Sequence, residues 1–312
     1  MTVPWRYVAV SVAGERSTWE GRACADAGAA RWDATSQALL LVAADGAGTA
    51  RCSRAAAQSV VDEVGERAFV GLRDDPLRLR DGALLEAYVV DLARAARGRL
   101  EAAAGGPGPA ASSTAAALPE PGATVLDDYA TTLLIALATP TWVAALQIGD
   151  GYVLRVTEPG GAEALFQPSR GRYANETAFV TSFASFDELR VRGQVQVRSL
   201  PADTTLALGL ITDGLEHVVM DMRAGGVPHE PLVASLMREL YRHEPEDFAA
   251  RLERYLLQSQ RVRERSDDDK TLVLALDLGR APTVVAAFER ASERDADGSE
   301  ARPAATLGAG DA

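Results

Sequence analysis

Short apolar runs that follow one another with hardly any residues between them restrict the fold of this chain more than any other feature. Residues 131–138 form one such run, and after a Pro-Thr turn residues 142–148 form the next. Parallel strands need a crossover of about a dozen residues or more, so strands this close must pair antiparallel. Runs of this kind predict strands at residues 7–12, 38–43, 131–138, 142–148, 152–156, 194–200, 205–211 and 271–276.

Helical periodicity occurs between these strands, and the helices it predicts come in pairs. Apolar residues recur at helical spacing in residues 57–68 and 85–96, directly after the second predicted strand. A second pair spans residues 232–240 and 248–256, with Pro245 suited to the first turn of the latter helix. Paired helices and antiparallel strands favour an α+β protein with helical layers over its sheets, and not a doubly wound one.

Composition separates the ordered part of the chain from two low-complexity parts. Residues 102–123 are rich in Ala, Gly, Pro and Ser, which is typical of a flexible insert. Residues 291–312 are polar and aperiodic and predict a disordered tail. We therefore expect a single domain over residues 1–290, interrupted by the insert.

The charge and the cysteine content exclude several classes of protein. A net charge of −12 and an isoelectric point near 4.8 argue against nucleic acid as a partner. No apolar run approaches the roughly 20 residues of a membrane helix, and the first residues lack the pattern of a secretory signal. We expect a cytoplasmic protein with no membrane partner. Cys24 and Cys52 are too few for a disulfide framework or a structural zinc site, so both are expected to be reduced and structural.

Acidic residues stand where several of the predicted strands begin or end. Asp45 and Asp213 each close an apolar strand and precede a glycine. Asp150 lies between two glycines in a turn, and Asp268 stands just before the last strand. Glycine at such positions lets other groups approach the backbone.

Two interpretations compete for these acidic positions. A single Asp-Gly is more often a turn than a binding site, and for Asp267 and Asp269 a solvated loop is the favoured interpretation. Four such positions on strands of one core favour a cluster of carboxylates. Clustered carboxylates repel one another unless cations bind between them, and hard oxygen ligands select Mg²⁺ or Mn²⁺.

The order of these motifs resembles that of the metal-dependent Ser/Thr phosphatases of the protein phosphatase 2C type. The resemblance spans about residues 5–278, and residues 17–27 and 171–177 are similar to segments of a bacterial branch. Each motif is weak by itself, but five in the family's order are a strong signal. The matching motifs are Asp45-Gly46-Ala47-Gly48, Ala130-Thr131-Thr132, Ile148-Gly149-Asp150-Gly151-Tyr152, Thr212-Asp213-Gly214-Leu215 and Asp268-Asp269-Lys270-Thr271-Leu272.

The resemblance implies a four-layer αββα sandwich, with two mainly antiparallel sheets flanked by helix pairs. It also implies a centre of two Mn²⁺ or Mg²⁺ ions at one end of the sheets. Asp45 would bridge both ions, and the carbonyl of Gly46 would complete one site. Asp213 and Asp268 would hold the other ion, while Asp150 and Asp213 would bind a third, weaker one. Catalysis would depend on Asp45, Asp213 and Asp268.

Residues around these ligands follow the family in part. Asp26 would hold a water molecule bound to a metal. Arg22 is the candidate for binding the substrate phosphate, although it is out of register with the family's arginine and a surface role is the alternative. Ala25 replaces a glutamate, which should weaken one metal site, and Ala47 stands where some members have a histidine acid. Cys24 belongs to the motif without being a nucleophile.

The implied activity is hydrolysis of phosphoserine and phosphothreonine in proteins by a hydroxide that bridges the metals. One alternative is a catalytically weak pseudophosphatase that regulates or binds phosphoproteins. Another is a hydrolase of small phosphoesters, which ranks last because no Gly-rich nucleotide loop is present. The partners would be a phosphoprotein substrate and a cognate Ser/Thr kinase. Residues 167–189 match the family's variable flap and should shape substrate choice. Within them Phe179, Phe183 and Phe186 are expected in the core, and His217 is expected on a helix surface.

Overall fold

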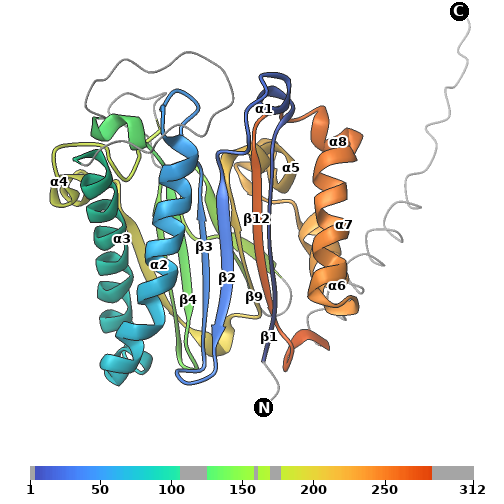
Figure 1. Cartoon of the computed structure of the whole chain (residues 1–312). Coiled ribbons are helices and arrows are strands. Elements are labelled where there is room, and N and C mark those ends of the chain that lie inside the picture. The colour runs from blue at the N-terminus through green and yellow to red at the C-terminus, as the bar shows by residue number, and fades with distance from the viewer. Residues whose placement is uncertain (1–3, 106–124, 158–160, 169–176, 283–312) are drawn as a thin grey trace, which may run out of the picture.

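Two five-stranded sheets stacked on each other form the middle of the molecule (Figure 1). The computed structural model describes residues 4–105, 125–157, 161–168 and 177–282. Every strand pair in the two sheets is antiparallel, as predicted. The first sheet has the order β1 (Trp5–Val12), β12 (Lys270–Asp277), β9 (Ala207–Ile211), β6 (Tyr152–Thr157), β7 (Gly161–Ala164). The second has the order β2 (Ala27–Asp33), β3 (Ala38–Ala44), β4 (Leu133–Ala138), β5 (Trp142–Ile148), β8 (Gln196–Pro201).

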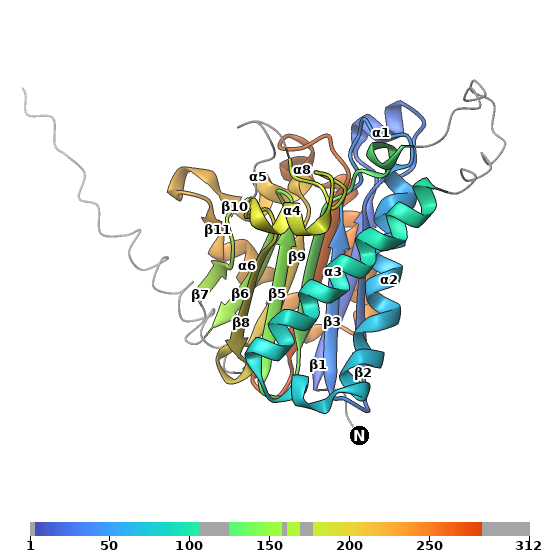
Figure 2. The same cartoon turned by 90° about the vertical axis from the view of Figure 1, so that its left-hand side faces the viewer.

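Helix pairs cover the outer faces of both sheets (Figures 1 and 2). The helices α2 (Ser53–Asp74) and α3 (Gly82–Ala104) lie on the second sheet, and α6 (Glu230–Arg242) and α7 (Pro245–Gln258) lie on the first. This confirms the αββα sandwich. The short elements are α1 (Glu15–Trp19), α4 (Phe186–Val191), α5 (Glu216–Val219), α8 (Gln260–Arg263), β10 (Met220–Asp221) and β11 (Val227–Pro228).

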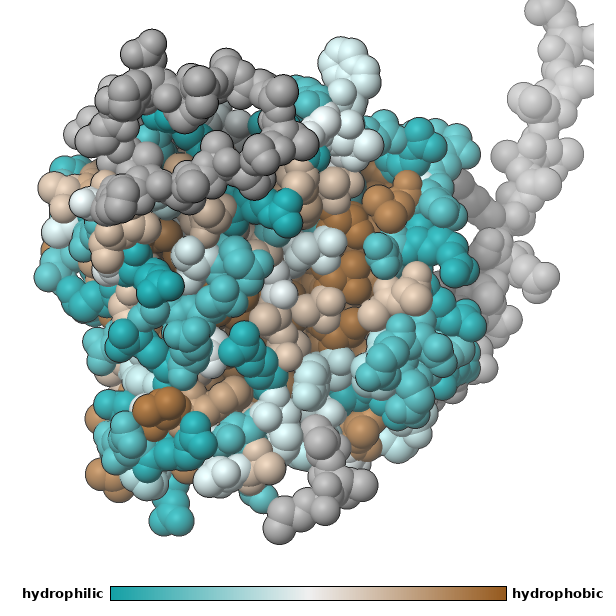
Figure 3. All heavy atoms as spheres, in the orientation of Figure 1, coloured by the Kyte–Doolittle hydropathy of each residue, from teal (hydrophilic) through white to brown (hydrophobic). Residues whose placement is uncertain are grey.

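Three layers of buried apolar side chains hold the four layers together. Between the sheets, Leu41, Leu134, Leu210 and Val273 are fully buried. Separate apolar cores fill the spaces between each sheet and its helix pair. Figure 3 shows the complementary pattern outside, with hydrophilic side chains over α7 and apolar ones gathered between α2 and α7. Central strands that are buried on both faces explain the continuous apolar runs in the sequence.

Some elements differ from the sequence prediction. Strand β2 was not predicted, because its sequence AGAARWD neither alternates nor contains β-branched residues. It forms nonetheless, because all seven of its residues pair with β3. Helix α3 continues through Ala104, so residues 102–104 are helical and do not belong to the insert. The rest of the predicted insert, except Gly105, and the predicted tail lie outside the described residues.

Two smaller predictions concern side-chain burial and membrane helices. Phe186 is buried, while Phe179 and Phe183 are only half-buried. His217 is exposed on α5, as expected. Within the described residues, no helix is both long and apolar enough to cross a membrane.

Candidate metal centre

The strand ends that carry the predicted aspartates all lie at one end of the sandwich, the end at which α1 is seen in Figure 1. Strand register is the cause. In the second sheet, Ala27 pairs with Ala44 and Leu133 pairs with Ile148. In the first sheet, Ile211 pairs with both Tyr152 and Leu272. The residues just beyond these pairs must therefore emerge together, and they include Asp26, Asp45, Asp150, Asp213 and Asp268.

Three of these carboxylates converge. Asp45, Asp150 and Asp213 each offer one carboxylate oxygen, and these oxygens lie within 4.8 Å of one another. We call these three residues the acidic cluster. Asp268 is not one of these three, and its half-exposed side chain accepts a hydrogen bond from the Asp269 amide at 2.9 Å and pairs with Arg16 at 4.0 Å. Its negative charge nevertheless raises the pKa of Asp45 and Asp213, after the larger effect of burial, so it stands at the rim of the cluster.

The backbone at Asp45 and Gly46 is fixed by the threonines of the second sequence motif. The Asp45 carbonyl accepts hydrogen bonds from Thr131 Oγ1 and from the Thr132 amide, both at 2.9 Å. The Asp45 amide donates to Thr132 Oγ1, also at 2.9 Å. Only glycine fits at position 46, because a Cβ there would lie 2.4 Å from the carbonyl oxygen of Ser53. The Asp45 side chain therefore extends from a backbone that is held in one position.

Asp26 lies behind the cluster and is almost completely buried. Thr212 Oγ1 donates to Asp26 Oδ2 at 2.7 Å and accepts from the Thr271 amide at 2.9 Å. The Asp26 carboxylate also lies close enough to the Asp45 carboxyl group for its charge to raise the pKa of Asp45, after the larger effect of burial. Its other oxygen, Oδ1, is buried and has no partner in the described structure. This position is compatible with the predicted role of Asp26, which is to hold a water molecule bound to a metal. The sequence does not indicate that Thr212 links Asp26 to the Thr271 amide.

Asp150 is held by a turn and by a hydroxyl group from a distant segment. Gly149 has a φ of +113°, which a side chain would strain, so the glycine permits this turn. Thr177 Oγ1 donates to Asp150 Oδ2. The opposite oxygen of Asp150, Oδ1, is buried without a partner among the described residues. Thr177 is the last residue of the 171–177 segment, which is similar to a segment of the bacterial branch. That similarity does not indicate the contact between Thr177 and Asp150.

The electrostatics of the cluster fit a bound cation. Burial raises the pKa of Asp26 to about 7 and that of Asp213 to about 8, and neighbouring carboxylates contribute further. The pKa values of Asp45 and Asp150 are also raised, mainly by burial. A carboxylate is costly to bury near others unless a positive charge compensates it. Oxygen-only donors with two unpartnered buried oxygens suit a hard divalent cation such as Mg²⁺ or Mn²⁺.

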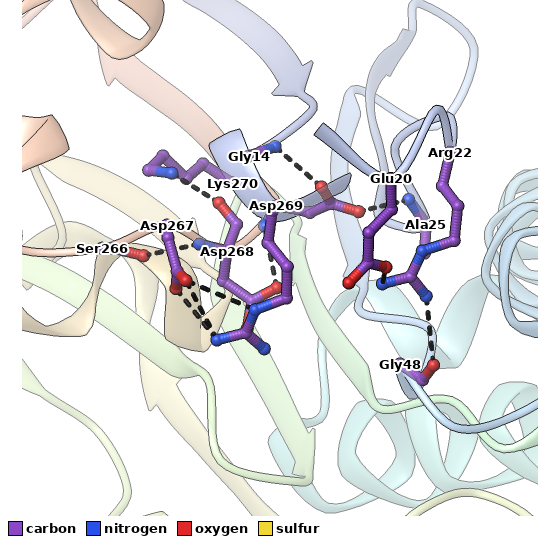
Figure 4. A network of polar contacts seen from close by, with 11 residues as sticks. Gly14, Glu20, Arg22, Ala25, Gly48, Ser266, Asp267, Asp268, Asp269 and Lys270 are labelled. Atoms are coloured by element: carbon purple, nitrogen blue, oxygen red, sulfur yellow. Dashed lines mark hydrogen bonds and ion pairs between the residues drawn. The ribbon is translucent and has the colours of Figure 1, made fainter. Parts of the chain in front are cut away.

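Arg22 lies beside the loop that follows Asp45. Its Nη1 donates to the Gly48 carbonyl at 3.2 Å, and its guanidinium is paired with Glu20 (Figure 4). The side chain is about half exposed, so it is accessible from outside. This location is compatible with the predicted phosphate-binding role, which stays a prediction.

The neighbours of Asp268 differ from the sequence prediction in one respect (Figure 4). Asp267 is exposed and forms an ion pair with Arg16 at 3.0 Å, as expected for a solvated loop. For Asp269 the solvated-loop interpretation is wrong, because this residue is 5% exposed. Its carboxylate accepts hydrogen bonds from the amides of Gly14 and Ala25. Both partners lie more than 240 residues away in the chain, so no local pattern could reveal them.

The surroundings of Cys24 make it a poor nucleophile. Burial raises the pKa of its thiol to about 12, and the charge of Asp26 adds to the effect. At pH 8 the folded protein should hold about 10³-fold less Cys24 thiolate than an ordinary thiol with a pKa of 9.0. We expect iodoacetamide to leave Cys24 unmodified in the folded protein and to modify it after denaturation, as mass spectrometry would show. Rapid modification of folded protein would contradict this view of the site.

Comparisons with known proteins identify the class to which this fold and this site belong. The family model described as protein phosphatase 2C matches residues 13–257. The chain therefore belongs to the protein phosphatase 2C family, whose members are metal-dependent. Serine/threonine-protein phosphatase 3 of Escherichia coli (strain K12) is 31% identical over 151 residues, which are 48% of this chain. The chain spans 56% of the length of that relative.

Solved structures support the same fold. A bacterial serine phosphatase covers 87% of this chain, and the match covers 97% of that structure, with a TM-score of 0.54 and 17% identity. Serine/threonine phosphatase Stp1 from Staphylococcus aureus matches 86% of this chain and 94% of its own, with a TM-score of 0.50 and 17% identity. At this identity the similarity establishes the shared sandwich.

Proposed function

We propose that this protein hydrolyses phosphoserine and phosphothreonine in proteins with the help of Mn²⁺ or Mg²⁺. The observation that carries the proposal is the convergence of the Asp45, Asp150 and Asp213 carboxylates within 4.8 Å on the ends of both sheets. Membership of the protein phosphatase 2C family and the similarity to a Ser/Thr phosphatase support the reaction type.

The residues at the ends of the strands would bind different metal ions. Asp45, the carbonyl of Gly46, Asp213 and Asp268 would hold two ions, and Asp150 with Asp213 would hold a third. When bound, divalent cations neutralise the phosphoryl oxygens and activate water for in-line attack on phosphorus.

Two side chains of the protein would act around this centre, one on a water molecule and one on the substrate phosphate. The unpartnered Oδ1 of Asp26 is an acceptor able to orient a water molecule beside Asp45. Arg22 would bind the substrate phosphate from the rim. Ala47 stands where some family members have a histidine acid, so the leaving oxygen would take its proton from water or from a donor bound to a metal ion.

Phosphate release from a phosphothreonine peptide tests the proposal directly. We expect release with Mn²⁺, loss of release with EDTA, and recovery when Mn²⁺ is added back in excess. Release that EDTA does not affect would contradict the metal requirement. No release from folded protein that binds Mn²⁺ by calorimetry would favour the pseudophosphatase instead.

The class of substrate is tested by comparing the phosphopeptide with a small phosphoester under the same conditions. We expect the higher kcat/KM for the phosphopeptide, and the opposite ratio would favour a small-molecule hydrolase. A cognate Ser/Thr kinase and a cytoplasmic location remain part of the proposal.

A further inference from the structure

Residues 14–25 connect β1 with β2 across the end of the sandwich that carries the acidic cluster. We call them the α1 segment, after the short helix that they contain. The segment begins at Gly14, close to the end of β1, and ends at Ala25, directly before Asp26. It therefore joins the edge strand of one sheet to the edge strand of the other.

One carboxylate holds both ends of the α1 segment. Asp269 Oδ1 accepts a hydrogen bond from the Gly14 amide at 2.8 Å, and Asp269 Oδ2 accepts one from the Ala25 amide at 2.6 Å (Figure 4). Two N–H donors thus use two different oxygens of one buried side chain. Only a carboxylate accepts at both of its terminal atoms, since an asparagine would turn an NH₂ group toward one of the amides.

Further contacts press the same segment against the chain next to Asp268. The Arg16 amide donates to the Asp267 carbonyl at 3.0 Å. A Cβ at Gly14 would lie 2.3 Å from the Asp268 carbonyl oxygen, so the two backbones are in direct contact. The α1 segment and residues 267–269 are therefore packed directly against each other.

These contacts matter for the acidic cluster because the α1 segment contains Arg22 and leads directly into Asp26. Ala25 precedes Asp26, whose carboxylate contacts Thr212 and Asp45. Arg22 lies in the same segment and reaches the Gly48 carbonyl on the loop after Asp45. Asp269 itself follows Asp268 directly.

We propose that Asp269 is a positioning residue, whose carboxylate fixes Asp26 and Arg22 relative to the acidic cluster by clamping both ends of the α1 segment. The proposal rests on the proposed phosphatase function only for its catalytic consequence. The two contacts themselves are a property of this structure, and an asparagine at position 269 could accept from only one of the two amides.

The test compares Asp269→Asn with Asp203→Asn, which makes the same change on an exposed carboxylate that lies just before β9, at the other end of the sandwich. In Asp269→Asn we expect amide hydrogen exchange in residues 14–25 to accelerate about tenfold or more, while exchange in the central strands is unchanged. We expect Mn²⁺ affinity, measured by calorimetry, to fall about 10–100-fold, as it does when groups that orient metal ligands are lost. Excess Mn²⁺ should restore part of the phosphate release, which a general loss of folding would not allow. Asp203→Asn should match wild type in exchange and in affinity.

Two results would overturn the proposal. One is a folded Asp269→Asn protein with wild-type exchange in the α1 segment and wild-type Mn²⁺ affinity. The other is fast exchange of the Gly14 and Ala25 amides in the wild-type protein, a measurement that is informative even if the variant does not fold. Neither readout requires catalysis, so an inactive wild-type protein would contradict the proposed function while leaving the clamp intact.

Discussion

Replacing Asp213 or Asp45 with asparagine is expected to lower Mn²⁺-dependent phosphate release at least about 100-fold. Each substitution keeps the shape of the side chain but removes one negative charge from the acidic cluster. Loss of a group that merely orients a metal ligand costs about 10–100-fold in affinity or activity, so loss of a ligand should cost no less. The measurement is kcat/KM on a phosphothreonine peptide over a range of Mn²⁺ concentrations.

Asp203→Asn provides the matched control for these variants. Asp203 is exposed and lies just before β9, whereas Asp213 lies just after that strand, so the two residues are at opposite ends of the sandwich. Asp203→Asn should retain wild-type activity. Activity of Asp213→Asn within a few-fold of the Asp203→Asn value would exclude Asp213 from the metal centre.

Thermal unfolding of the metal-free protein separates loss of function from loss of folding. The pKa of Asp213 is about 8 in the folded protein, against an ordinary value of 3.8, chiefly because the group is buried. Between these pH values the folded protein binds more protons than the unfolded chain, so this group lowers the free energy of unfolding as pH rises from about 4 to about 8. Asp213→Asn removes that contribution. Metal-free Asp213→Asn should therefore melt no lower than wild type at pH 8, while Mn²⁺ should stabilise it less.

The features that sequence predicted well are those set by local patterns. Continuous apolar runs located the central strands, because strands buried on both faces need no polar positions. Helical spacing located the two helix pairs, because each of these helices buries one apolar face against a sheet. The Asp-Gly motifs located the three carboxylates of the acidic cluster, since each motif marks the end of a strand and the register brings those ends together.

The features that sequence missed depend on partners far away in the chain. Strand β2 forms because β3 offers it a complete set of hydrogen bonds, which its own composition does not announce. Asp269 was interpreted as solvated because an aspartate in an acidic run is normally exposed, but two distant amides make its burial favourable. Nothing in the sequence distinguishes Arg97, because a lone arginine within a helix gives no sign that it is buried.

Arg97 lies outside the site, and its replacement should lower stability strongly. It lies on α3, is 1% exposed, and its guanidinium donates to the carbonyls of Val180 at 3.2 Å, Ser182 at 3.1 Å and Phe183 at 3.0 Å. Its Nε also pairs with the half-exposed Glu101. Arg97→Met should lower the free energy of unfolding by about 2–4 kcal/mol, because it leaves buried carbonyls without donors. Denaturant unfolding at fixed pH measures the change.

Arg94→Met on the same helix isolates the effect of burial. Arg94 is also paired with an acid, Asp187, but both side chains are substantially exposed, and exposed pairs contribute about 1 kcal/mol or less. Arg97→Lys should recover only part of the loss, since an ammonium group lacks the planar fork that serves several carbonyls at once.

The consequence for the site follows from the segment that Arg97 holds. The Val180 amide donates to the Thr131 carbonyl at 2.8 Å, and Thr177 in the same segment donates to Asp150. Loosening residues 177–183 should therefore weaken Mn²⁺ binding as well as stability. Arg94→Met should lower stability by about 1 kcal/mol or less and leave Mn²⁺ binding unchanged. If Arg97→Met and Arg94→Met lost equal stability, the three carbonyl contacts would contribute nothing beyond an ordinary surface pair, and α3 would have no part in holding Asp150.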